Sequence, residues 1–197
     1  MKFKVFGTEV YISFLFAAVL TVMLATDRTG LLLPALFAVF MHEMGHLFAM
    51  WVLECSPKQI RLIPASVQIV RKMEVRQRNE IIIALCGPLV NIILFASLYI
   101  NFLCFKNEMC LYYAVLNLII GLFNLLPVSG LDGGTILFNI ISRKKEMRTA
   151  QIVVRIITFI VALTAITLAV MLTVRGKINL SLYIMGIYFT IMALIKI

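Results

Sequence analysis

The sequence predicts an all-α polytopic membrane protein with about six transmembrane helices. Two features of composition support this class, since 62% of the 197 residues are hydrophobic and only 14% are charged. Soluble domains are nearer half apolar and a quarter charged. Because a helix needs about 20 apolar residues to cross a bilayer, the length limits the chain to about six or seven spans. We therefore expect a single integral-membrane domain over residues 1–197.

Six apolar runs are the candidate spans. The first begins shortly after the basic start Met-Lys-Phe-Lys. We favour an uncleaved helix over a signal peptide there, because its apolar stretch is slightly long and a second run follows at once. The runs are Val10–Ala25, Leu31–Leu53, Ile81–Phe105, Met109–Leu126 with an irregular continuation to Ile141, Ile152–Val174 and Leu180–Ile195.

Basic residues predict the orientation of these spans. If the N-terminus is cytoplasmic, fourteen of the eighteen Lys and Arg residues fall on the inner side. Arg28, Lys106, Arg175 and Lys177 remain outside. An excess of Lys and Arg in cytoplasmic loops is the usual determinant of topology. We therefore expect a multi-pass protein of the cytoplasmic membrane with both termini inside, and we assign the net charge of +9 to orientation rather than to a nucleic-acid partner.

The loop over residues 56–79 alternates apolar and polar residues around a break at Pro64-Ala65-Ser66. This alternation predicts a membrane-associated β-hairpin between the second and third spans. Two interpretations are open from the pattern alone. The loop is either a basic segment resting on anionic lipid head groups, or a strand pair whose edge accepts an extended peptide.

His42 and His46 are the two histidines of the chain, and both lie inside the second apolar run, in the sequence FMHEMGHLFAM. Residues four apart share one face of a helix, so the two imidazoles can bind one zinc ion. Glu43 follows the first ligand and can take a proton from an activated water. Gly45 leaves room for another backbone or a substrate. An accidental match is the alternative, but ionisable residues at membrane depth usually mark function.

A catalytic zinc site normally has three protein ligands, and Asp132 is the candidate for the third. It lies in FNLLPVSGLDGG, where Pro127, Gly130, Gly133 and Gly134 predict a break in the fourth span. Irregular backbone is tolerated at membrane depth only where protein or a water-filled cavity covers it. The alternative is an interfacial loop with an Asp-Gly turn. The histidine pair argues against this alternative.

Two asparagines, Asn91 and Asn124, are polar residues within the apolar runs. Asn124 precedes the predicted break, and its amide has two equal interpretations. It either packs between helices or donates a hydrogen bond to a substrate carbonyl or developing oxyanion. Asn91 lies in ALCGPLVN of the third span, where Gly87-Pro88 predicts close packing and a kink. We interpret Asn91 as a structural interhelical hydrogen bond.

Three motifs in order resemble the site-2 protease family of intramembrane zinc metalloproteases. They are the HExxH of His42–His46, the A-x-x-G-P-x-x-N of Ala84–Asn91 and the N-x-L-P-x-x-x-L-D-G-G of Asn124–Gly134. With its small size, the chain resembles most the sporulation branch of this family. That branch processes a membrane-associated pro-sigma factor. The resemblance covers roughly residues 31–142, and we expect the catalytic core there.

The resemblance implies zinc as cofactor, with His42, His46 and Asp132 as ligands and Glu43 as general base and acid. It also implies that Asn124 lies near the substrate and that residues 56–79 form the family's membrane-associated hairpin, which favours strand addition. Two features depart from the family. Pro64-Ala65-Ser66-Val67 replaces a Pro-Phe-Gly-Gly-like turn, and we expect no nucleotide-sensing CBS domain.

The expected function is hydrolysis of a peptide bond within or next to a transmembrane segment of a membrane-associated protein. The lipid bilayer is the second expected partner, while a regulatory membrane partner and a homo-oligomer stay open. A transmembrane zinc transporter is the main alternative, although the chain has no histidine outside His42 and His46. A non-catalytic scaffold is the other alternative, and it would need neither ligands nor a base.

Overall fold

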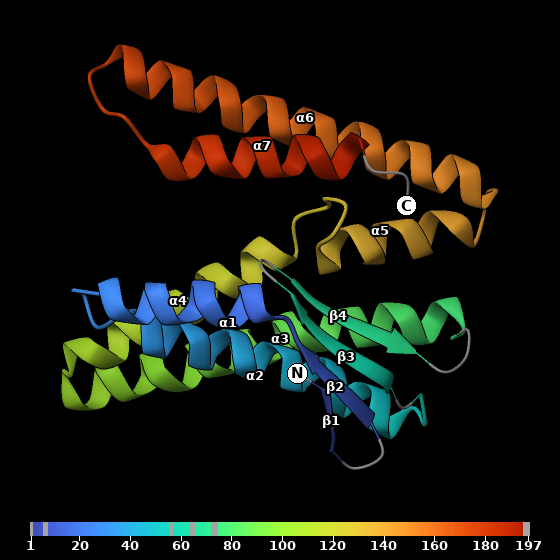
Figure 1. The fold of residues 1–197 in the computed structure, drawn as a ribbon, viewed down its shortest axis with the longest axis horizontal. Coiled ribbons are helices and arrows are strands. Elements are labelled where there is room, and N and C mark those ends of the chain that lie inside the picture. Colours follow the sequence, from blue (N-terminus) through green and yellow to red (C-terminus); the bar gives the residue numbers. More distant parts are fainter. Residues whose placement is uncertain (1, 6–7, 56, 64–65, 72–74, 195–197) are drawn as a thin grey trace. The chain divides into compact units, whose positions relative to one another are not determined.

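The computed structural model describes residues 2–5, 8–55, 57–63, 66–71 and 75–194 (Figure 1). The chain is predominantly helical, with seven helices and four short strands in these residues. It divides into two compact units, Met1–Gly121 and Leu122–Ile197. Each unit has its own internal packing.

The helices largely follow the predicted apolar runs. They are α1 (Phe14–Thr26), α2 (Leu32–Val52), α3 (Gln77–Phe105), α4 (Glu108–Asn124), α5 (Asp132–Ser142), α6 (Met147–Val174) and α7 (Leu180–Leu194). By length and composition, α2, α3 and α6 can each cross a membrane. The apolar helices α1, α4 and α7 are shorter. The count of six spans therefore stays a prediction.

The strands form one sheet in the first unit, in the order β1-β2-β3-β4. The bounds are β1 Lys2–Val5, β2 Thr8–Ile12, β3 Pro57–Ile63 and β4 Ser66–Arg71. β1 pairs antiparallel with β2, and β2 pairs parallel with β3. The predicted start of the first span at Val10 is wrong, because the backbone of Val10 pairs with Phe3 and Ile60 and the helix begins at Phe14.

Within residues 56–79, strands β3 and β4 pair antiparallel, with Ile60 opposite Ile69 and Ile63 opposite Ser66. Residues 64–65, where the sequence departs from the family's turn, lie outside the described residues. β4 is an edge strand of the sheet. Whether this strand pair rests on the membrane stays a prediction.

Helix α2 starts from a short polar connection after α1. The carboxylate of Asp27 accepts hydrogen bonds from the backbone N–H and hydroxyl of Thr29, at 2.9 and 2.7 Å, and from the N–H of Leu32 at 3.1 Å. The Thr29 hydroxyl and these N–H groups hold the pKa of Asp27 below its usual range. The charged carboxylate therefore stabilises the start of the helix that bears both histidines.

Helices α2 and α3 pack face to face through small residues. The buried face of α2 includes Ala38, His42, Gly45 and His46. A Cβ atom at Gly45 would lie 2.6 Å from the carbonyl oxygen of Cys86 in α3. The sequence prediction that Gly45 admits another backbone is therefore confirmed. Small residues at such a contact let transmembrane helices approach closely.

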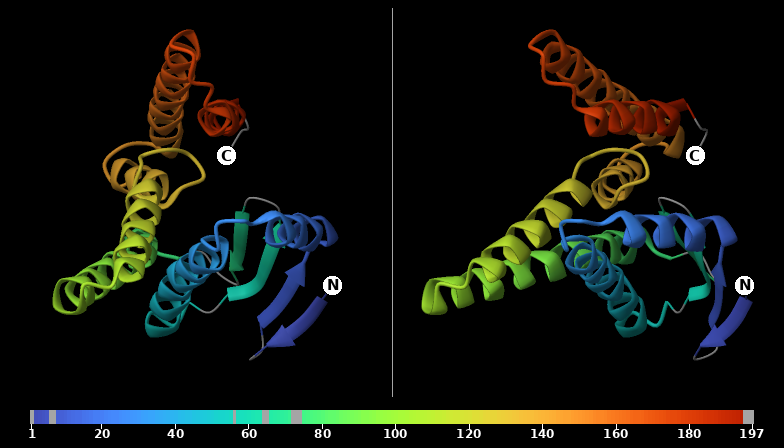
Figure 2. Two further views of the ribbon diagram at one scale, coloured as in Figure 1. Left: turned by 90° about the vertical axis from the view of Figure 1, so that its left-hand side faces the viewer. Right: turned by 60° about the vertical axis from the view of Figure 1, so that its left-hand side comes forward.

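The second unit contains α5, α6 and α7, and α6 packs against α7 at an angle (Figure 2). Val128 and Phe189 are fully buried and pack with Ala162. The predicted irregular continuation to Ile141 is too long. The irregular segment covers residues 125–131, and α5 begins at Asp132, because Gly133 and Gly134 fit into its first turn rather than ending a helix.

Candidate metal centre

His42 and His46 face each other from successive turns of α2. Their side chains are 4% and 7% exposed, and their Nε2 atoms are 3.1 Å apart. The ring planes are inclined by 83°. The spacing of four residues in the sequence is therefore enough to bring two potential ligand atoms together on one buried face.

Hydrogen bonds at Nδ1 set the tautomer of each ring. His46 Nδ1 lies 2.8 Å from the backbone oxygen of Ile83, which can only accept, so this nitrogen carries the proton. His42 Nδ1 lies 2.6 Å from Asn91 Oδ1. The Asn91 amide nitrogen donates to the backbone oxygen of Ala38 at 3.1 Å, which orients the amide oxygen toward His42. His42 Nδ1 is therefore also the donor.

In neutral rings with protonated Nδ1 atoms, both Nε2 atoms carry a lone pair. Two lone pairs at 3.1 Å repel each other unless a cation or proton lies between them. In a tetrahedral site with Zn–N bonds of about 2.0–2.1 Å, two nitrogen ligands lie about 3.3 Å apart. The pair therefore fits a bound zinc ion, and the hydrogen bonds at Nδ1 are the outer contacts that such ligands usually have.

Gly87 of α3 makes this arrangement possible. A Cβ atom at this position would lie 2.8 Å from His42 Nε2 and closer still to His46 Nε2. The backbone of α3 therefore passes directly beside the ligand atoms. The predicted close packing at Gly87-Pro88 is confirmed.

Asp132 is the first residue of α5 and is half-buried. A carboxylate in the first turn of a helix is stabilised by the helix dipole. Cβ atoms at Gly133 and Gly134 would enter the backbone of Leu125, Leu126 and Val128, so this turn lies against the irregular segment. The segment itself is held by a 2.8 Å hydrogen bond from Ser129 N–H to the buried Thr158 hydroxyl of α6.

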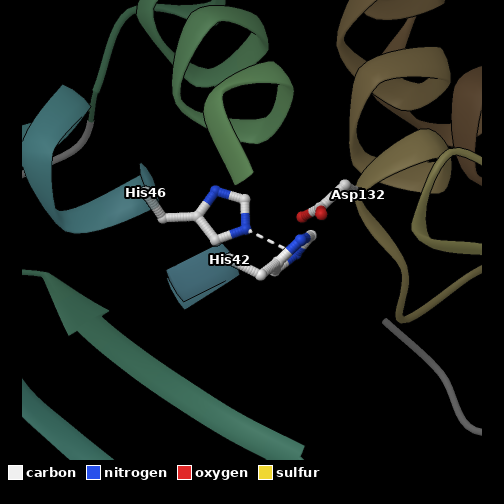
Figure 3. A group of neighbouring side chains, drawn as sticks. All are labelled: His42, His46 and Asp132. Atoms are coloured by element: carbon white, nitrogen blue, oxygen red, sulfur yellow. Dashed lines mark hydrogen bonds between the residues drawn. The ribbon is translucent and has the colours of Figure 1, made fainter. Parts of the chain in front are cut away.

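Figure 3 draws the side chains of His42, His46 and Asp132, each of which offers one atom that could be a metal ligand. His42 and His46 belong to the first unit, while Asp132 belongs to the second. Glu43 follows His42 on α2 and is half-buried. Asn124 is the last residue of α4 and lies in the second unit.

The predicted interhelical hydrogen bond of Asn91 is confirmed. A purely structural role does not account for its amide oxygen, which contacts His42 directly. The available signal was the spacing to Gly87, since residues four apart on α3 share one face. An amide on the face where a glycine admits the histidine helix is placed to orient a ligand.

Comparison with known proteins indicates the family. Residues 107–168 match the model of peptidase family M50. Over 154 residues the chain is 30% identical to a zinc metalloprotease of Methanocaldococcus jannaschii, a match that covers 72% of this chain and 45% of that protein. The structure also resembles the site-2 protease from Methanocaldococcus jannaschii. The chain therefore has the fold of a site-2 protease and is similar in sequence to a zinc metalloprotease.

The solved site-2 protease has a TM-score of 0.73 and 22% identity with this chain, and the match covers 100% of this chain and 97% of the other. At this identity the likeness shows a shared fold. The chain spans about half the length of the curated zinc metalloprotease, at 45%. The predicted resemblance to site-2 proteases is confirmed, while the closer likeness to the sporulation branch stays a prediction.

Proposed function

We propose that this chain is an intramembrane zinc metalloendopeptidase that hydrolyses a peptide bond within or next to a transmembrane segment of a membrane-associated protein. One observation carries the proposal. Two buried imidazoles bring their Nε2 atoms within 3.1 Å of each other while both Nδ1 atoms are held by hydrogen bonds. Such a pair can bind a cation, and Glu43 follows His42 directly in the same helix.

His42, His46 and Asp132 would hold the metal, two neutral nitrogens and one anionic oxygen. This is a ligand set of the kind found in catalytic zinc sites, with a fourth position left for water. When bound, zinc supplies a Lewis acid that activates water and polarises a carbonyl group. The carboxylate of Asp132 offsets part of the positive charge, which lowers the cost of placing an ion at membrane depth.

Glu43 would move the proton. Its carboxylate accepts the proton of the attacking water and returns it to the amide nitrogen that leaves. Asn124 would donate a hydrogen bond from its amide to the substrate carbonyl. A transmembrane substrate must unwind before its backbone is accessible, and the edge strand β4 offers backbone groups with which an extended segment can pair.

Orientation completes the proposal. With both termini cytoplasmic, His46 lies nearer the inner end of α2, at Val52, than the outer end, at Leu32. Cleavage would then occur in the cytoplasmic half of the membrane. Any membrane protein with an accessible segment at this depth is a candidate substrate, so the test follows the whole membrane proteome.

Glu43→Gln is the decisive variant, because it keeps the size of the side chain and removes its ability to accept a proton. We expect zinc content to remain close to that of the wild type, while membrane-protein precursors accumulate in cells that carry the variant. Loss of one catalytic acid–base group typically lowers the rate by about 10²–10⁴-fold. Quantitative membrane proteomics and metal analysis of the purified protein measure the two effects.

Glu54→Gln is the matched control, because Glu54 is exposed just beyond the end of α2. It should leave both zinc content and precursor processing unchanged. Zinc flux through liposomes containing the wild-type protein, with the same membrane proteome in wild-type and Glu43→Gln cells, would instead support a transporter and overturn the protease proposal.

A further inference from the structure

Asn91 is linked to a second buried asparagine, Asn117 of α4. The Asn91 amide nitrogen donates one hydrogen to Ala38 O and the other to Asn117 Oδ1, at 3.1 and 3.0 Å. Asn117 in turn donates from its amide nitrogen to the backbone oxygen of Tyr113 at 2.9 Å. Asn91 is fully buried and Asn117 is 5% exposed. The chain of contacts thus runs from α4 through α3 to His42 on α2.

The direction of every hydrogen bond in this chain is determined. The backbone oxygen of Tyr113 can only accept, so Asn117 must direct its amide nitrogen there and its oxygen toward Asn91. Asn91 then directs its nitrogen toward Asn117 and its oxygen toward His42. The last donor is His42 Nδ1–H, and the ring keeps the lone pair at Nε2, where a metal would bind.

Helix α4 is shaped to hold this contact. Its buried face consists of Ala114, Asn117 and Gly121, which follow helical spacing. A Cβ atom at Gly121 would lie 3.1 Å from Asn91 Cβ and 3.3 Å from the backbone oxygen of Pro88. The absence of a side chain at Gly121 therefore lets α4 come close enough for the amide of Asn117 to reach Asn91.

We propose that Asn117 is a positioning residue for the metal site, acting through Asn91 on the orientation and tautomer of His42. The inference rests on the proposed role of His42 as a ligand. Without an acceptor at position 117, one N–H of Asn91 must find another partner, and the amide can rotate away from His42. The ring is then held less firmly, and its Nε2 becomes a weaker ligand.

Asn117→Leu tests the proposal, because leucine has a similar volume and offers no acceptor. Loss of an outer contact to a metal ligand typically costs about 10–100-fold in metal affinity. Since Asn117 acts one contact further out, we expect zinc affinity to fall about tenfold, the lower end of that range. The measurement is a zinc dissociation constant from chelator competition on the full-length purified protein, together with the absorption spectrum of the cobalt-substituted form.

Asn117→Asp should keep affinity near that of the wild type, because a protonated carboxyl group accepts from Asn91 with one oxygen and donates to the Tyr113 oxygen with the other. Asn101→Leu is the matched control. Asn101 also bonds across α3 and α4, accepting from the Cys110 thiol at 3.2 Å, but it lies ten residues along α3 from Asn91. This control should leave zinc affinity and the cobalt spectrum unchanged. If Asn117→Leu fails to fold, Asn117→Ala takes its place, since it introduces no new atoms.

Zinc affinity within twofold of the wild type in the Asn117→Leu protein would overturn the proposal. Equal losses in Asn117→Leu and Asn101→Leu, or no recovery in Asn117→Asp, would also overturn it, because the effect would then be general packing. Failure of the proposed function is distinguishable, since in that case the wild-type protein itself would bind no zinc or would process no membrane protein.

Discussion

Gly87 lies on the face of α3 that contacts both histidines, and a methyl group there would enter the space of their Nε2 atoms. We expect Gly87→Ala to lower zinc affinity by roughly 100-fold, the upper end of the range for changes to residues that contact metal ligands. In a helix, alanine is more favourable than glycine by about 1 kcal/mol. A loss of zinc binding could therefore not be attributed to a less stable α3. Chelator competition measures the affinity.

The control for Gly87→Ala is Leu89→Ala, two residues along the same helix. Leu89 is 51% exposed and turned away from the histidines, so its truncation should leave zinc affinity unchanged. Unchanged affinity in Gly87→Ala would mean that the rings move aside at little cost, and that the close approach of α3 has no part in the site.

At this scale the sequence reveals residues whose chemistry is rare in an apolar chain. Histidines, glutamate and aspartate are costly in a membrane, so His42, Glu43, His46 and Asp132 could all be selected from the sequence. An asparagine does not indicate a functional site by its residue type alone, because a buried amide serves helix packing and function equally well. The contact of Asn91 with His42, and that of Asn117 with Asn91, depend on which helices meet, and one sequence does not contain that information.

At the scale of elements, α6 holds the segment that leads to Asp132. The Thr158 hydroxyl accepts from Ser129 N–H and donates to the Val154 oxygen at 2.7 Å, and the side chain is fully buried. Thr158→Val keeps the shape and leaves the Ser129 N–H without this acceptor. We expect a loss of about 1–3 kcal/mol in stability, the usual cost of a buried unsatisfied group. Thermal unfolding in detergent measures the change.

Processing of membrane precursors should also decline in the Thr158→Val protein, because residues 128–131 position the start of α5. Thr158→Ser keeps the hydroxyl and should recover most of the stability. Thr164→Val is a control on the same helix, since the Thr164 hydroxyl is exposed and bonds only locally, to Val161. A Thr158→Val protein as stable and active as the wild type would show that α6 does not hold this segment.

The elements divide into those that local patterns predict and those that need partners. Long apolar runs identify α2, α3 and α6 because a membrane helix satisfies its own backbone. Residues 10–12 of β2 continue directly into the apolar run of α1, so the local pattern does not separate strand from helix, and the strand depends on its pairing with β1 and β3. The helix at Asp132 was missed because Gly133 and Gly134, which usually end helices, are used here for close backbone packing.

At the scale of the whole molecule, the distribution of basic residues makes a prediction about topology. The connection at residues 106–107 should lie outside, and the connection at residues 143–146 should lie in the cytoplasm. Both Asn107 and Glu146 are exposed and lie between helices. In a cysteine-free background, Asn107→Cys should react with a membrane-impermeant maleimide in intact cells. Glu146→Cys should react only after the cells are permeabilised.

Neither substitution changes a Lys or Arg, so the charges that determine the orientation stay in place. The two connections also lie at opposite ends of the α4–α5 segment, which carries both Asn124 and Asp132. Opposite labelling of the two positions would mean that this segment as a whole crosses the membrane, as a site at membrane depth requires. Labelling of both positions in intact cells would place the segment on one side, and the metal site could then not lie within the bilayer.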